Sequence, residues 1–206
     1  MSSSGHLVFF QSLFGIEEPQ LFFDIMLHLG TLLAVVVYFR TDIWKIIQGL
    51  DAILKREEKN LEGIKLLFWI ILATLPTGLM GVLLKDWFES FFSKPRMVGV
   101  MLLITGLMLW LTRWTKKEGK NIKEMKWVDA ILIGTAQGLA IIPGISRSGA
   151  TISTGLFCGL DREPSGRFSF LLSIPAILGA TLLEFGKVNL ESSLWTILIG
   201  TATAFG

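Results

Sequence analysis

Residues 128–160 read VDAILIGTAQGLAIIPGISRSGATISTGLFCGL, and this stretch decides the fold. Apolar flanks surround the polar segment 143–149, and each flank is shorter than the roughly 20 helical residues needed to cross a bilayer. Pro143-Gly144 breaks a helix. Because irregular backbone at membrane depth is tolerated only where it lines a cavity or is buried in protein, the stretch predicts a re-entrant helix hairpin with a polar tip.

The rest of the chain supplies the membrane spans for this hairpin. Of the 206 residues, 51% are hydrophobic and 17% are charged, against about 25% charged in soluble domains. Four apolar runs are near the length of a span, at residues 21–39, 66–84, 97–112 and 168–185. A net charge of +2 excludes a nucleic-acid partner, and the single Cys158 excludes a disulfide scaffold. We therefore predict an all-α polytopic membrane protein rather than a soluble domain with buried core helices.

Basic residues predict the orientation. Segments 40–65 and 113–126 carry six Lys or Arg each, whereas segment 85–96 carries three. Since cytoplasmic connections are enriched in Lys and Arg, the connections at about 40–63 and 113–127 are expected to be cytoplasmic. The N-terminal end then faces outward.

The chain also contains an internal repeat. Residues 2–6 (SSSGH) align with residues 146–150 (SRSGA) at an offset of 144, and residues 23–30 align with 168–175 at an offset of 145. An odd number of spans separates the polar tips, so they enter the membrane in opposite senses. We predict a single membrane domain over 1–206 with an inverted-topology repeat, about 1–112 and about 128–206, the second copy incomplete. Broken segments in such folds meet near the midplane and form the binding site.

The second tip has the chemistry of a phosphate site. Backbone N–H groups of residues 146–151 are expected at the start of a half-helix, where they attract anions. A guanidinium at membrane depth costs about 3 kcal/mol or more when unpaired and marks a functional site. The expected phosphate-binding residues are Ser146, Arg147, Ser148, Gly149 and Thr151. The alternative is an interfacial Arg147 that pairs with Asp161 or Glu163.

The first tip has proton chemistry. His6 follows the serine run 2–4, and an imidazole exchanges protons near neutral pH. It is expected to activate Ser3 or a water, or to protonate a leaving phosphate oxygen, while Arg147 holds the charge. The alternative is a polar N-terminal tail in which His6 has no role.

Three further polar residues are candidates for the cavity wall. Asp24 and His28 are four apart and share one helix face. Gln137 lies shortly before the Pro143 break, where its amide is expected to supply hydrogen bonds.

Residues 137–151 (QGLAIIPGISRSGAT) resemble the second signature of the bacterial undecaprenyl-diphosphate phosphatase family, also known as the bacitracin-resistance protein family. Residues 2–7 (SSSGHL) resemble the end of its first signature, and 23–35 and 166–184 also match, so the resemblance covers essentially the whole chain. It implies a multi-pass enzyme of the bacterial inner membrane that hydrolyses undecaprenyl diphosphate to undecaprenyl phosphate and inorganic phosphate. Such an enzyme recycles the lipid carrier for peptidoglycan synthesis and confers bacitracin resistance. Its partners would be the polyprenyl diphosphate lipid and membrane lipids, and a homodimer is common in such folds.

The resemblance also assigns roles. It implies His6, Ser3 and Arg147 as catalytic residues, and Ser4 beside the second-tip residues in phosphate binding. It further implies a divalent cation, Mg²⁺ or Ca²⁺, but the family's acidic E-x-x-x-E stretch before the first tip has no counterpart after Met1. Because the sequence also ends inside an apolar run at 198–206, we expect a chain truncated at both ends.

Two other functions remain open at the level of sequence. Inverted repeats with broken helices also occur in transporters, so a transporter or polyprenyl-phosphate flippase without hydrolysis is the main alternative. An acid-phosphatase-type lipid phosphatase shares a Ser-Gly-His string but needs a second histidine after an Arg-containing motif. The other histidine, His28, lies before Arg147.

Overall fold

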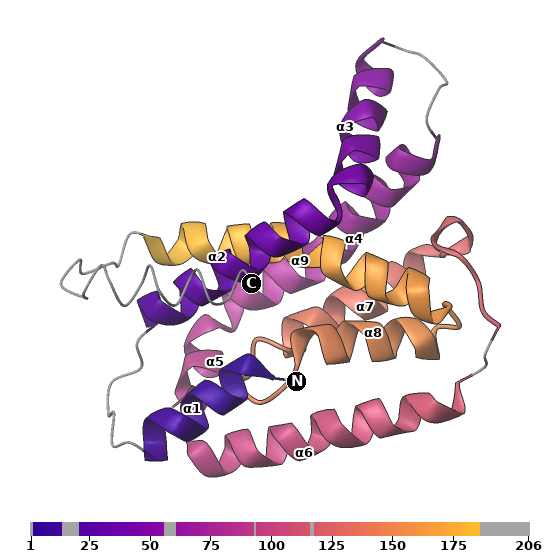
Figure 1. Cartoon of the computed structure of the whole chain (residues 1–206). Coiled ribbons are helices and arrows are strands. Elements are labelled where there is room, and N and C mark those ends of the chain that lie inside the picture. Colours follow the sequence, from indigo (N-terminus) through magenta and orange to yellow (C-terminus); the bar gives the residue numbers. More distant parts are fainter. Residues whose placement is uncertain (1, 14–20, 56–60, 93, 116–117, 186–206) are drawn as a thin grey trace. The chain divides into compact units, whose positions relative to one another are not determined.

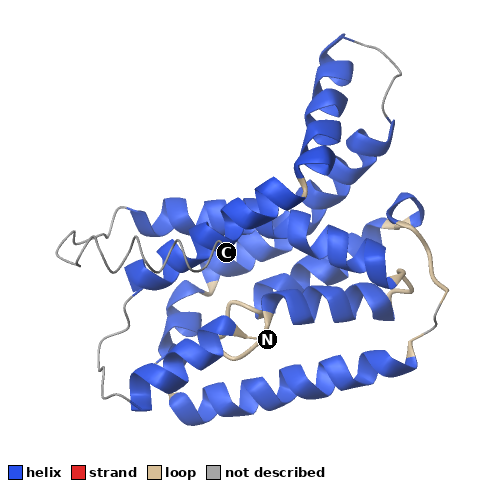
Figure 2. Ribbon diagram, viewed as in Figure 1, coloured by secondary structure: helices blue, strands red, loops and turns tan. Residues whose placement is uncertain are grey.

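The computed structural model describes residues 2–13, 21–55, 61–92, 94–115 and 118–185 (Figure 1). Within these residues the regular structure is helical (Figure 2), apart from an isolated bridge between Lys120 and Leu160. In chain order the helices are α1 (Ser3–Leu13), α2 (Leu21–Tyr38), α3 (Arg40–Lys55), α4 (Leu61–Leu83), α5 (Lys85–Phe92), α6 (Pro95–Leu111), α7 (Trp127–Leu139), α8 (Arg147–Phe157) and α9 (Arg162–Phe185). Short 3₁₀ turns lie at Thr112–Trp114 and Ile122–Glu124. The predicted all-α class is confirmed. The end of the predicted second repeat, including the apolar run at 198–206, lies outside the described residues.

Three described helices are long and apolar enough to cross a membrane, at Glu62–Leu83, Pro95–Trp114 and Arg162–Leu182. Their large apolar side chains are widely exposed, for example Leu75 at 62%, Leu103 at 75% and Leu182 at 78%. Apolar side chains exposed along the length of three helices form larger patches than a soluble monomer usually shows, so this exposure fits a lipid environment. The fourth apolar run forms α2, whose described apolar part is the shorter stretch His28–Tyr38.

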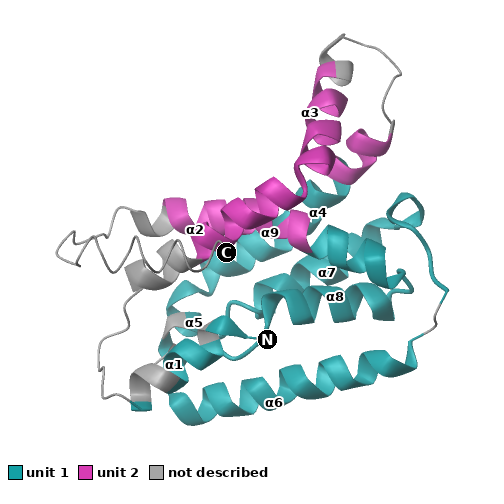
Figure 3. Ribbon diagram, in the orientation of Figure 1, with its two compact units in different colours: residues 1–19, 68–169 teal, residues 20–67, 170–206 magenta. Residues whose placement is uncertain are grey.

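The chain divides into two compact units (Figure 3). The first comprises Met1–Pro19 and Phe68–Ser169, and the second comprises Gln20–Leu67 and Phe170–Gly206. Both predicted polar tips belong to the first unit. In that unit α6 packs against α1, α5 and α8, and α7 packs against α8.

The helix break predicted within residues 128–160 is present. Helix α7 ends at Leu139, α8 begins at Arg147, and residues between them form turns. Gly144 sits in this turn with a φ of +98°, a conformation that glycine adopts without the strain other residues incur. The turn is seated on an apolar cluster of Phe88, Phe91 and Ile142. Since Phe88 and Phe91 come from α5, this short helix provides the packing surface for the turn.

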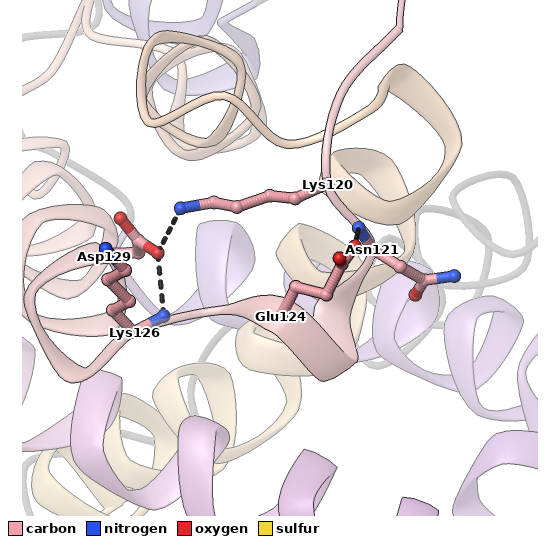
Figure 4. Close-up of polar contacts among 5 residues, drawn as sticks. All are labelled: Lys120, Asn121, Glu124, Lys126 and Asp129. Atoms are coloured by element: carbon pink, nitrogen blue, oxygen red, sulfur yellow. Dashed lines mark hydrogen bonds and ion pairs between the residues drawn. The ribbon is translucent and has the colours of Figure 1, made fainter.

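A polar clamp holds the other end of α8. The Nζ of Lys120 lies 2.5 Å from Oδ2 of Asp129, which also accepts a 2.8 Å hydrogen bond from the Lys126 backbone N–H (Figure 4). The Lys120 N–H donates to the Gly159 carbonyl at 2.8 Å, and the Lys120 carbonyl accepts from the Asp161 N–H at 3.1 Å. The segment after α6 is thereby tied both to the start of α7 and to the turn that follows α8.

The second unit contains a helix within the segment expected as a cytoplasmic connection at 40–63. There α3 packs on the first turn of α4, where a Cβ added at Gly49 would lie 3.0 Å from the Ile64 nitrogen. The ring of Phe39 stacks on that of Phe170, with centroids 5.8 Å apart. The orientation of this unit's connection in the membrane stays a prediction.

Candidate active site

The two polar tips are capped in the same way. Ser146 Oγ accepts a 3.1 Å hydrogen bond from the Gly149 N–H, and Ser2 Oγ accepts a 3.3 Å bond from the Gly5 N–H. Such side-chain caps satisfy one of the unpaired donors at a helix N-terminus. The repeat at an offset of 144 aligns Ser2 with Ser146 and Gly5 with Gly149, so the same positions form the cap in both tips. The inverted repeat itself stays a prediction, but its two tips share one local structure.

Both tips rest on α6. A Cβ added at Gly5 would lie 2.9 Å from a methyl carbon of Leu102 and 3.0 Å from the Cα of Gly144. A Cβ added at Gly149 would lie 3.6 Å from the Thr105 methyl group. Leu102 and Thr105 are three residues apart, so they share one face of α6. Two helix N-termini, far apart in the sequence, are therefore held side by side on that face.

Thr105 attaches the second tip to α6 through polar contacts. Its hydroxyl donates to the Gly144 carbonyl at 3.0 Å and accepts from the Ser146 N–H at 3.1 Å. The residue is 7% exposed, so water does not readily replace either bond. Within the sequence Thr105 is one residue of an apolar run, and nothing local to it signals this role.

We expect Thr105→Val to destabilise the protein by about 2 kcal/mol, because the isosteric side chain leaves two buried backbone groups without partners. Thermal unfolding in detergent would measure the effect. The matched control is Thr74→Val: among the described residues the Thr74 hydroxyl bonds only the Ile70 carbonyl of its own helix, so the expected cost is below about 0.5 kcal/mol. Equal shifts in both variants would contradict the assignment.

Three backbone N–H groups of the expected anion site at residues 146–151 already have hydrogen-bond partners. The Ser146 N–H bonds Thr105, the Gly149 N–H bonds the Ser146 cap, and the Ala150 N–H bonds the Ser146 carbonyl. The first N–H groups of a helix have no intrahelical partner, so those of Arg147 and Ser148 remain for an anion. Phosphate binding by the backbone of residues 146–151 stays a prediction, with the N–H groups of Arg147 and Ser148 as its available donors.

The hydroxyl groups of the second tip differ in their surroundings. Thr151 is 1% exposed, and its hydroxyl bonds the Arg147 carbonyl at 2.9 Å and lies 2.5 Å from Ser169 Oγ. These contacts join α8 to α9. Ser146 is buried and caps α8, whereas Ser148 is half-buried and its hydroxyl bonds none of the described residues. Phosphate binding by Ser146 and Thr151 stays a prediction, and Ser148 has the most accessible hydroxyl of the three.

Arg147 begins α8 and is partly buried. The alternative role for this residue required an ion pair with Asp161 or Glu163, but among the described residues no carboxylate pairs with its guanidinium. Helix α8 has 11 residues and so extends about 16 Å, which places Arg147 at the opposite end from Asp161. Asp161 instead accepts a 2.5 Å hydrogen bond from the Gly119 N–H.

His6 is the fourth residue of α1 and is exposed, while Ser2 is 3% exposed. The first tip is therefore a packed helix start rather than an unstructured tail. The His6 Nδ1 lies 2.7 Å from the Ser2 carbonyl oxygen. Because a carbonyl only accepts, Nδ1 carries the proton, and Nε2 of the neutral ring carries the lone pair. Ser3 is also exposed, and the Ser4 side chain lies outside the described residues.

The three cavity-wall candidates are distributed over both units. Gln137 is 2% exposed on α7, where its Nε2 donates to Thr77 Oγ1 at 3.3 Å and its Oε1 has no partner among the described residues. His28 is half-buried on α2 of the second unit, and the side chain of Asp24 on the same helix is outside the described part. The cavity-wall assignment of all three stays a prediction.

Comparison with known proteins identifies the family. The family described as Bacitracin resistance protein BacA matches residues 1–206. A relative from Desulfosudis oleivorans named undecaprenyl-diphosphatase is 49% identical, covering 100% of this chain and 78% of the relative. The chain belongs to the BacA family. Relatives of the same name from Desulforapulum autotrophicum and Halothermothrix orenii are 43% and 44% identical, covering 98% and 99% of this chain and 80% and 76% of theirs. The resemblance drawn from the signatures is confirmed, and the BacA chain is a membrane protein.

The divalent cation implied for a BacA protein does not fit the donors described here. Mg²⁺ and Ca²⁺ prefer carboxylate and other oxygen ligands. The described residues of the tips offer hydroxyls, one imidazole and one amide, and no group of three His, Cys, Asp or Glu in the described part of the chain is placed to hold a metal ion.

Proposed function

We propose that this protein is a multi-pass undecaprenyl-diphosphatase of the bacterial inner membrane. It removes the terminal phosphate of undecaprenyl diphosphate and so returns the lipid carrier to peptidoglycan synthesis. The observation that carries the proposal is the pairing of two capped helix starts on one face of α6, one bearing Arg147 and the other His6. Family membership and the names of the relatives support the same reaction.

In the proposed reaction the second tip binds the terminal phosphate. The Arg147 guanidinium presents a planar fork of donors to phosphate oxygens, and the N–H groups of Arg147 and Ser148 add two donors at the positive end of α8. The Ser148 hydroxyl completes this set. These donors stabilise the negative charge on the transferred phosphoryl group, which is the main requirement of phosphoryl transfer.

In the proposed reaction His6 of the first tip transfers the proton. The Ser2 carbonyl orients the His6 ring through Nδ1, which leaves the Nε2 lone pair to accept a proton from water or from Ser3. For attack by water, an O–P bond forms, the anhydride P–O bond breaks, and undecaprenyl phosphate leaves with the bridging oxygen. The proton taken by Nε2 is then passed to solvent or to the leaving oxygen.

We expect His6→Asn to lower phosphate release from undecaprenyl diphosphate by about 100-fold. The asparagine amide N–H replaces the Nδ1–H bond to Ser2 but provides no base at the Nε2 position, so the fold of the tip is retained while proton transfer is lost. Release of inorganic phosphate in detergent is the measurement, with the unfolding temperature as the check on folding. Undiminished release would contradict the role of His6. Movement of the lipid across liposomes with no phosphate release by the wild-type protein would instead favour the flippase alternative.

A further inference from the structure

A Trp–Arg–Trp cluster lies where α6 ends, away from the proposed catalytic residues. The indoles of Trp110 and Trp114 meet edge to face with ring centroids 4.2 Å apart. The guanidinium carbon of Arg113 lies 5.9 Å from the Trp110 centroid and 5.4 Å from the Trp114 centroid. Both distances are within the range of cation–π interactions.

The cluster is exposed. Trp110 is 51% exposed, Trp114 is 60% exposed, and Arg113 is also exposed. Among the described residues, no carboxylate pairs with the Arg113 guanidinium. The Arg113 side chain is exposed beside the two indoles, so its N–H groups remain able to donate to a phosphate. Contact with the indoles also restricts the side chain before a ligand binds, which lowers the entropy cost of binding.

The position of the cluster along α6 points to a lipid headgroup. The apolar helix Pro95–Trp114 is 20 residues long, about the length that spans the hydrocarbon core, so its last turn lies at the level of the headgroups. Indole rings prefer this region of a bilayer. The following segment, 113–126, carries six Lys or Arg and two Glu, and such basic segments attract anionic lipids.

We infer that Trp110, Arg113 and Trp114 form a binding site for the phosphate headgroup of an anionic phospholipid in the leaflet at this end of α6. Arg113 binds the phosphate, and the two indoles hold the guanidinium and contact the glycerol and upper acyl region. The net positive charge of the adjoining segment selects an anionic over a zwitterionic headgroup.

The test is equilibrium binding of phosphatidylglycerol to the full chain in a non-ionic detergent, followed by native mass spectrometry. Because one cationic residue near an anionic surface contributes about 1 kcal/mol, Arg113→Gln is expected to weaken phosphatidylglycerol binding about five-fold. Arg113→Lys, which keeps the charge but not the planar fork, is expected to lose about half of that binding advantage. The matched control is Arg96→Gln, an exposed arginine in the first turn of the same helix, for which the expected change is less than about two-fold.

Three results would overturn the inference. They are equal loss of binding in the Arg113 and Arg96 variants, equal affinity of the wild-type protein for phosphatidylglycerol and phosphatidylcholine, and displacement of the lipid by inorganic phosphate alone. Circular dichroism of Arg113→Gln checks the helix content. If that variant does not fold, Trp110→Leu supplies the second test. It is also expected to lose the preference for phosphatidylglycerol over phosphatidylcholine.

Discussion

Replacing Arg147 with alanine is expected to reduce phosphate release from undecaprenyl diphosphate by about 1,000-fold, the scale reported for arginines that stabilise a transferring phosphoryl group. The reason is local. Arg147 supplies the only side-chain charge proposed for the phosphate site, since the other proposed donors are the N–H groups of residues 147 and 148 and hydroxyls. The rate under saturating substrate and the KM would both be measured, because a donor to the transferred group lowers kcat as well as binding.

The unfolding temperature of Arg147→Ala distinguishes a role in phosphate binding from a structural role. Since no described carboxylate pairs with Arg147, alanine leaves no partner charge buried behind it, and the unfolding temperature is expected to stay the same or rise. Arg147→Lys is expected to recover part of the rate by restoring the charge. Arg162→Ala, at an exposed position in the first turn of α9, is the matched control. Equal activity of the Arg147 and Arg162 variants would remove Arg147 from the phosphate site.

Replacing Gly144 with alanine is expected to destabilise the hairpin by about 4 kcal/mol, from backbone strain together with overpacking. Gly144 has a φ of +98°, and an added Cβ would lie 2.5 Å from the Val98 carbonyl oxygen and 2.8 Å from the Met101 Cβ. Both contacts are with α6, so the turn cannot move toward that helix. Loss of folded protein in detergent, read by thermal or denaturant unfolding, is the measurement.

Gly159→Ala is the matched control for Gly144→Ala. Gly159 has a similar φ of +86° but no heavy atom within 4 Å of an added Cβ, so only the strain is incurred, at about 1 kcal/mol. The difference between the two variants isolates the packing of the turn against α6. If the two glycine variants unfold alike, the close approach of the turn to α6 is not what stabilises it.

The helices around the second tip could be predicted because their signals are local. Pro143-Gly144 marks the break, and the lengths of the apolar runs give α4, α6 and α9. Helix α3 is not among the predicted elements because the charges of segment 40–65 indicate a connection, although the apolar residues of α3 lie on one face. Helix α5 is not among the predicted elements either, because eight residues give too short a periodic pattern to recognise.

The contacts of the site depend on residues far apart in the sequence. Thr105 bonds Ser146 across 41 positions, and a threonine within an apolar run has no local feature that names its partner. Which nitrogen of His6 carries the proton likewise depends on the position of the Ser2 carbonyl oxygen, which the sequence does not specify. Sequence patterns therefore gave the residue types at the tips and their capping positions, but not which N–H groups the fold already uses.

Both ends of α8 are hydrogen-bonded to α6 or to the segment that follows α6. Thr105, in α6, bonds the N-cap residue Ser146 at the start of α8. Lys120, a few residues beyond α6, bonds the turn after α8. Sliding of α8 along α6 would therefore break the buried Thr105–Ser146 hydrogen bond at one end and the Lys120–Gly159 hydrogen bond at the other. Any motion that admits or releases a long isoprenoid tail is therefore expected to move α6 and α8 together as a rigid body. The opening itself is expected to come from other helices.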